Sequence, residues 1–193
     1  MDLKLEKGSP ADYSDRLIKE QKCYQLLDEL GLEYYRCDHP EANADTMEAC
    51  LGIDAILEAT VCKNLFLCNR QQTQFYLLMM PGDKVFKTKE LSGQLGCARL
   101  SFGSPEKMEE YLDITPGSVS VLGLMNDTEN KVRLLVDEDV LKGEYLGCHP
   151  CINTTSLKIK TRDVFDVFLK RVHHDYTTVH LEGELATSHS TKE

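Results

Sequence analysis

The sequence lacks long hydrophobic runs, and its first residues do not have the pattern expected of an export signal. No apolar segment approaches the roughly 18 residues that suggest a membrane-spanning helix. The N-terminal stretch MDLKLEK mixes charged and apolar side chains and contains no apolar core of a secretory signal. We therefore expect a cytosolic protein that does not enter a membrane.

The sequence also lacks several short motifs that indicate a particular class of reaction. Neither the GxGxxG nor the GxxxxGK[ST] pattern occurs, which argues against chemistry on nucleoside triphosphates. No GxSxG segment is present, so nothing predicts the nucleophile elbow of an α/β hydrolase. A serine hydrolase triad cannot be assigned from the sequence, and no internal repeat is found.

Eight cysteines are present, but only one C-x-x-C segment, Cys148-His149-Pro150-Cys151. A zinc site of this type needs a second pair of ligands, and a thioredoxin-like motif belongs between a strand and a helix. Here the segment lies between two expected strands. A chain of 193 residues folds without disulfides, so we expect reduced thiols and neither a metal nor a cofactor, and a redox role stays a minor alternative.

The charge of the chain is acidic overall and unevenly distributed. The formal net charge is -10, yet six basic and only two acidic side chains lie between Val61 and Ser101. That stretch carries +4, which leaves -14 for the remainder. A basic face on an acidic body favours binding one end of an RNA over broad nucleic-acid binding. A chance cluster of solvated charge is the alternative.

Helical and strand-like segments alternate without a regular βαβ repeat. The patterns predict a helix over 14–30, a hairpin from the apolar runs 64–68 and 75–80, a helix that begins at Ser104-Pro105, strands over 145–148 and 155–160, and a last helix from Thr161. We therefore expect one α+β domain over 14–180, with a mixed, largely antiparallel sheet and surrounding helices. A flexible leader, 1–13, and a disordered polar tail, 181–193, complete the expected organisation.

Three segments contain candidates for binding or catalysis. Lys63-Asn64 begins an apolar strand, where a lysine is either an edge charge or, beside an asparagine, a clamp for a phosphate or carbonyl oxygen. His149 is either a structural hydrogen-bonding group or part of a pocket wall. Gly117-Ser118 offers consecutive N–H groups for an oxyanion, although an ordinary helix cap explains it equally.

Taken in order, the motifs closely resemble the free-standing prolyl-tRNA synthetase-associated editing domains, the PrdX/ProX branch of the YbaK-like superfamily. The resemblance covers about residues 14–180. The segments that carry it are DHP at 38–40, TMEA at 46–49, CKNLFL at 62–67, RLSFGSPE at 99–106, TPGSVS at 115–120, GLMND at 123–127 and HPCINT at 149–154.

The resemblance implies a fold, a reaction and a set of site residues. It implies an aminoacyl-tRNA deacylase with Lys63, Asn64 and His149 as the catalytic residues. The substrate-binding residues expected with them are Thr46, Gly117, Ser118, Gly147, Cys148 and Pro150. The family often has an aromatic residue where Cys148 stands, which affects the expected width of the pocket.

Members of this family hydrolyse alanine wrongly attached to proline tRNA. The resemblance therefore implies a trans-editing hydrolase that acts on Ala-tRNA(Pro). Its expected partners are the acceptor 3′ end of aminoacyl-tRNA and prolyl-tRNA synthetase, but not DNA. Two alternatives stay open, namely a deacylase for cysteine or serine on tRNA, and a non-catalytic module that binds tRNA or the synthetase.

Overall fold

The computed structural model describes residues 3–40 and 47–183, and in this part of the chain nine strands form one sheet. The strand order is β1-β2-β8-β7-β3-β4-β6-β9, with β5 paired to β3 outside this path. The strands are β1 Glu6–Lys7, β2 Tyr34–Asp38, β3 Thr60–Cys68, β4 Phe75–Pro81, β5 Ser101–Phe102, β6 Val132–Asp137, β7 Tyr145–Cys148, β8 Thr155–Lys160 and β9 Tyr176–Val179.

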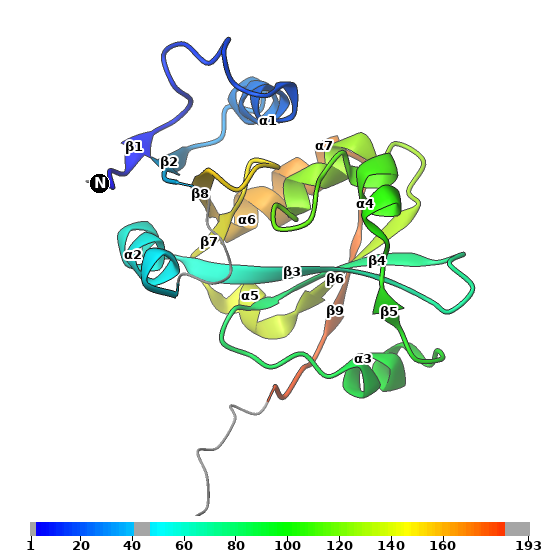
Figure 1. The fold of residues 1–193 in the computed structure, drawn as a ribbon. Helices are drawn as coiled ribbons and strands as arrows, with labels where there is room; N and C mark the ends of the chain where they lie inside the picture. The colour runs from blue at the N-terminus through cyan, green and yellow to red at the C-terminus, as the bar shows by residue number, and fades with distance from the viewer. Residues whose placement is uncertain (1–2, 41–46, 184–193) are drawn as a thin grey trace, which may run out of the picture.

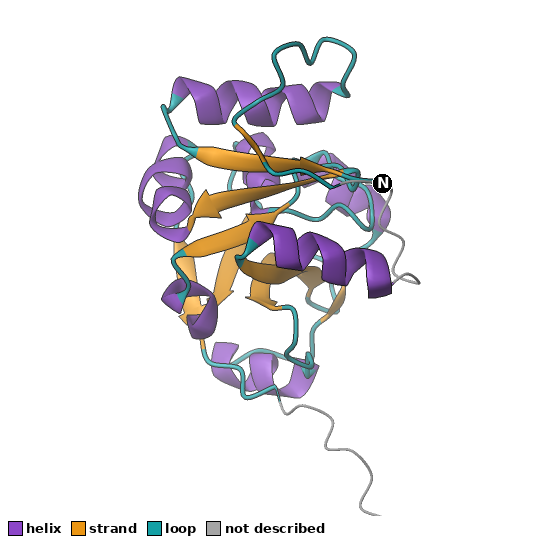
Figure 2. Ribbon diagram, turned by 90° about the vertical axis from the view of Figure 1, so that its left-hand side faces the viewer, coloured by secondary structure: helices purple, strands orange, loops and turns teal. Residues whose placement is uncertain are grey.

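Helices surround this sheet, with α1 and α3 at opposite ends of the molecule and α2 at the start of β3 (Figures 1 and 2). They are α1 Ile18–Glu29, α2 Met47–Leu57, α3 Thr88–Leu95, α4 Pro105–Leu112, η1 Val121–Asn126, α5 Glu138–Lys142, and the consecutive α6 Thr161–Asp163, η2 Val164–Phe168 and α7 Leu169–Arg171. None of the described helices is long and apolar enough to cross a lipid bilayer.

The pairing of the strands is mixed, as the sequence predicted. Five pairs are antiparallel, including the hairpin β3–β4 and the neighbours β7–β8, whereas β3–β7, β4–β6 and β6–β9 are parallel. The expected fold class is therefore confirmed. Helix α4 begins as predicted, because the Ser104 hydroxyl accepts a hydrogen bond from the Lys107 N–H and Pro105 follows it.

Several boundaries differ from the sequence-based expectation. Helix α1 begins at Ile18 and not at Ser14, and no side chain caps its first turn. Residues 6–7, inside the expected leader, form the outer strand β1 beside β2. Strand β9 was not predicted, because YTTV is short and mostly polar. From residue 184 onward, the expected tail lies outside the described residues.

The central strands bury side chains on both faces of the sheet. All seven residues of β4 are buried, and alternate ones enter two different apolar clusters. Leu77 and Met79 pack with α1 and the C-terminal helix, whereas Leu78 and Met80 pack with Leu91 of α3. This period of two follows from the opposite directions of successive side chains in a strand. The core therefore fixes the register of β3 beside β4, and β3 carries the candidate site.

A partly buried ionic network fastens the entry to α1 onto the sheet. The Arg16 guanidinium donates two hydrogen bonds to the Asp38 carboxylate, at 2.9 and 3.2 Å, and one to Glu20 at 3.0 Å. The Thr155 hydroxyl donates to Asp38 at 2.8 Å. Burial alone would raise the pKa of Asp38, but the hydrogen bonds from Arg16 and Thr155 lower it to about 2.

We expect Asp38→Asn to lower the free energy of unfolding at pH 7 by about 1–2 kcal/mol. This figure is smaller than the pKa shift alone implies, because the Asp38 side chain is 39% exposed and water screens its charge. A lowered carboxyl pKa stabilises the fold above the unfolded value of about 3.9, and this contribution is lost as the pH falls towards 2. Urea unfolding at several pH values measures the difference. The exposed Asp15→Asn variant is the control, and equal stability of both variants at pH 7 would contradict the expectation.

Candidate active site

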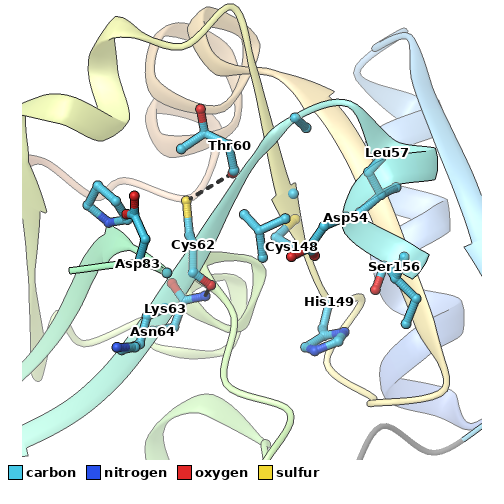
Figure 3. Close-up of a pocket in the computed structure, with 16 residues that line it drawn as sticks. Asp54, Leu57, Thr60, Cys62, Lys63, Asn64, Asp83, Cys148, His149 and Ser156 are labelled. Carbon is cyan, nitrogen blue, oxygen red and sulfur yellow. Dashed lines mark hydrogen bonds between the residues drawn. The ribbon is translucent and has the colours of Figure 1, made fainter. Parts of the chain in front are cut away.

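A cavity of about 560 Å³ opens where β3 begins, next to β7, β8 and the end of α2 (Figure 3). Strands β3 and β7 are parallel here, with Thr60 opposite Leu146 and Val61 opposite Gly147. The volume falls in the range of small-molecule sites. Of the residues expected at the site, five line this cavity, namely Lys63, Asn64, Gly147, Cys148 and His149.

Lys63 supplies the cation of the cavity. Its ammonium donates a hydrogen bond to the backbone carbonyl of Lys84 at 2.9 Å. Lys84 is itself held, because its Nζ lies 3.0 Å from the buried Asp137 carboxylate and 2.6 Å from Asp139. An ammonium has three donors, so Lys63 is fixed by one contact and keeps donors for an oxygen of a ligand.

Asn64 presents an acceptor that the described part of the protein leaves without a partner. Its Nδ2 donates to the Cys62 carbonyl at 3.4 Å, which orients the amide. Its Oδ1 is buried and has no hydrogen-bond partner. Because an unsatisfied buried acceptor costs about 1–3 kcal/mol, it identifies a place where a ligand donor would be stabilised.

His149 has a defined tautomer. Its Nδ1 lies 2.9 Å from the Thr155 carbonyl, and a carbonyl oxygen only accepts, so Nδ1 carries the proton. Burial lowers the pKa of His149 below its usual range, and the neighbouring His39 lowers it further. The ring is therefore neutral at pH 7, with the lone pair on Nε2. This nitrogen is suited to accept a hydrogen bond from water or substrate.

Two cysteines line the cavity, the buried Cys148 and the half-buried Cys62. Cys148 is 6% exposed, and burial raises its pKa well above the usual range. Burial also raises the pKa of Cys62 to about 12. Cys148 and Cys151 are both free, and the Sγ of Cys151 lies 3.6 Å from that of Cys23 in the core. A thiol that resists ionisation is a poor nucleophile, so the burial of Cys148 disfavours the redox alternative.

Among the described residues, three of those expected to bind substrate are not found in the wall of the cavity. Gly117, Ser118 and Pro150 do not line it, and Thr46 lies outside the described residues. Gly117 has a φ of +90°, and a Cβ there would lie 3.9 Å from Nδ2 of Asn153. The Ser120 hydroxyl is hydrogen bonded to the Cys148 thiol and lowers its pKa slightly against the effect of burial.

Other polar residues at the cavity were missed by the sequence analysis. Asp54 of α2 and Asp83 after β4 bring two carboxylates to its wall, and burial raises the pKa of Asp54. Asp54 points into the cavity towards Cys148 (Figure 3). The amphipathic pattern of 47–57 could have shown that Asp54 follows the buried Ile53, but nothing in it indicates where the carboxylate points.

A serine and histidine pair forms the remaining polar wall. His39 Nδ1 lies 2.8 Å from the Pro40 carbonyl, so it carries the proton, and Nε2 accepts the hydroxyl proton of Ser156 at 2.9 Å. Ser156 lines the cavity with its proton committed to His39. Its lone pairs are therefore available to a donor. The DHP segment was noted in the sequence, but its contact with a residue 117 positions away has no local signature.

Comparisons with known proteins agree on the family. Residues 41–167 match the family model of the aminoacyl-tRNA editing domain. The chain is 30% identical to the prolyl-tRNA editing protein ProX of Acetoanaerobium sticklandii over 145 residues, which are 75% of this chain and 87% of that protein. It is also 30% identical to prolyl-tRNA synthetase associated domain-containing protein 1 of Danio rerio, over 78% of this chain and 80% of the relative.

The fold is also similar to that of a solved structure. The crystal structure of a candidate trans-editing enzyme for prolyl tRNA synthetase superposes with a TM-score of 0.63, over 86% of this chain and 97% of that one. At 14% identity this likeness concerns the fold alone. The family model spans well over half of the sequence. The chain therefore belongs to the aminoacyl-tRNA editing domain family, and it is an enzyme of the aminoacyl-tRNA deacylase class, as its motifs predicted.

Proposed function

We propose that this protein is a trans-editing hydrolase that removes alanine wrongly attached to proline tRNA. The main support for this proposal is that Lys63, Asn64 and His149 line the same cavity in a chain of the editing family. Relatives named for prolyl-tRNA editing and for prolyl-tRNA synthetase support proline as the tRNA identity. Prolyl-tRNA synthetase as a partner and a cytosolic location belong to the same proposal.

The polar groups of the cavity complement the charges of an aminoacyl ester. Such an ester offers an α-ammonium group at one end and a carbonyl oxygen and phosphate at the other. The carboxylate of Asp54 and the unpaired Oδ1 of Asn64 are acceptors for the ammonium. The Lys63 ammonium is a donor for the carbonyl oxygen or the terminal phosphate. The donors and acceptors therefore fix one orientation of the ester.

The reaction needs little activation, because an ester is already reactive towards water. We propose that Nε2 of His149 holds the attacking water, and that Lys63 stabilises the negative charge on the carbonyl oxygen. Water adds to the carbonyl carbon and the bond to the ribose oxygen breaks. One proton of the water passes to that oxygen through the neighbouring ribose hydroxyl. The other leaves with the carboxyl group of the released amino acid.

An editing enzyme is useful because the amino-acid site of prolyl-tRNA synthetase, which must accept proline, cannot strongly exclude the smaller alanine. A missing methylene changes binding by only about 1–3 kcal/mol. A second, narrower pocket admits alanine and rejects proline. We propose that Cys148 and His149 set the width of this second pocket, since both lie in its wall.

The test is deacylation of Ala-, Ser-, Cys- and Pro-tRNA by the purified protein. We expect Ala-tRNA(Pro) to be hydrolysed fastest and correctly charged Pro-tRNA to remain intact. Preference for serine or cysteine would replace the substrate within the same reaction. Tight binding of every tRNA without turnover would instead overturn the catalytic assignment and favour a binding module.

A further inference from the structure

An exposed aromatic side chain lies opposite the later part of β3, the strand that also carries the candidate active site, and takes no part in the chemistry described above. Phe102 of β5 is 66% exposed, more than any other large hydrophobic side chain among the described residues. Its ring meets that of Phe86 edge to face, with centroids 6.2 Å apart and an interplanar angle of 65°. Phe102 and the half-buried Phe86 therefore form one aromatic surface that is open to a ligand.

The backbone holds Phe102 in place. Strand β5 is hydrogen bonded to β3, with Phe102 opposite Leu67, and the next N–H, that of Gly103, donates to the Phe66 carbonyl at 2.9 Å. Gly103 is required for this approach, because a Cβ there would lie 2.4 Å from the Phe66 ring. The aromatic side chain is therefore displayed from a fixed strand and not from a loose loop.

The same strand connects Phe102 to the cavity. Side chains alternate along β3, so Lys63, Leu65 and Leu67 share one face, and Phe102 shares it as the partner of Leu67. Leu67 lies four residue steps after Lys63 along the strand, a span of about 13 Å. Phe86 is connected to the cavity by a second route. Lys63 donates a hydrogen bond to the Lys84 carbonyl, and Phe86 is two residues after Lys84 in the chain. Figure 1 shows α2 at one end of β3 and β5 near the other.

Basic residues are close in sequence to the two members of the aromatic pair. Lys87 and Lys89 flank the start of α3, Arg99 lies just before β5, and all three are exposed. The acidic residue closest to them in sequence is Glu90, whose Oε1 accepts the backbone N–H of Glu182 and whose Oε2 is buried. An aromatic face with surrounding cations suits a single-stranded nucleic acid, whose bases stack and whose phosphates carry the charge.

We propose that Phe102, supported by Phe86, is a stacking platform for the single-stranded 3′-terminal nucleotides of tRNA. The terminal aminoacyl ester then reaches the cavity past Lys63, while the preceding bases lie on Phe102. Lys89 and Arg99 contact the phosphates of these nucleotides. This inference rests on the proposed function for the identity of the RNA, because the platform itself fits any unpaired strand.

The test is binding of an uncharged tRNA transcript with its CCA end, and of the same transcript without these three nucleotides. We expect wild-type protein to prefer the complete transcript, and Phe102→Ala to weaken that binding by about tenfold and abolish the preference. Phe102→Trp should bind at least as tightly as wild type, because the larger ring also stacks. Lys89→Ala and Arg99→Ala should each make binding less dependent on salt.

The matched control is Leu17→Ala, which removes a side chain of similar exposure, 62%, from the entry to α1. The platform is overturned if Phe102→Ala binds both transcripts as wild type does, or if Phe102→Ala and Leu17→Ala lose affinity equally. Equal losses in Phe102→Ala and Phe102→Trp would also overturn it. The binding assay needs no turnover, so absent deacylation with an intact CCA preference would refute the proposed reaction and leave the platform standing.

Discussion

Replacement of Lys63 by alanine should lower kcat/KM for deacylation of Ala-tRNA by about 100-fold or more. Removing one donor that stabilises an oxyanion typically costs 10²–10³ in rate. Lys63 is the cation that lines the cavity, and its position depends on a carbonyl that Lys84 holds in place. Single-turnover hydrolysis of Ala-tRNA under saturating enzyme measures the chemical step separately from binding.

The control for this prediction must separate loss of charge from loss of structure. Lys63→Met keeps the stem of the side chain and should be as inactive as Lys63→Ala. Lys131→Ala removes an exposed lysine at the start of β6 and should hydrolyse Ala-tRNA at the wild-type rate. Thermal unfolding of each variant shows whether it is folded. Undiminished hydrolysis by folded Lys63→Ala would refute the assigned role.

Sequence patterns predicted the interior of this fold better than its edges. The strands β7 and β8 were placed at their observed bounds, because apolar alternation and flanking turns define both. The start of α4 was predicted from Ser104 and Pro105, whose effect on a helix is local. Strands β1, β5 and β9 are defined by hydrogen bonds to strands that are distant in the chain, and not by a pattern of their own. Two-residue strands such as Glu6–Lys7 have no periodicity to detect.

The residues of the site could likewise be predicted where a local motif identifies them, but not where their contacts depend on strand pairing. Lys63-Asn64 and Gly147-Cys148-His149 were identified from the order of their motifs, and the parallel pairing of β3 with β7 brings them together. That pairing was not predictable, because the sequence pattern of a strand does not indicate which other strand it pairs with. The contact of Ser156 with His39 depends in turn on β2 lying beside β8. Gly117 and Ser118 were also assigned to the site, but the structure does not place either residue in the lining of this cavity.

Replacement of Cys148 by alanine should widen the pocket and weaken its rejection of proline. Cys148 is almost fully enclosed, and its neighbours leave it little freedom to move, since the Ser120 hydroxyl contacts its thiol. Removing the sulfur leaves space that a larger amino acid can fill. Because each methylene is worth about 1–3 kcal/mol in such a pocket, we expect the ratio of Pro-tRNA to Ala-tRNA hydrolysis to rise by roughly tenfold or more.

The isosteric variant Cys148→Ser separates the size of this side chain from its chemistry. Serine nearly retains the volume, so its selectivity should remain that of wild type, although a buried hydroxyl needs the Ser120 oxygen as a partner. If both variants lose activity towards Ala-tRNA, the thiol contributes more than volume, and the redox alternative regains support. If neither variant changes the ratio of hydrolysis rates, the pocket width is set elsewhere. His149 and Leu57 would then be the next wall residues to vary.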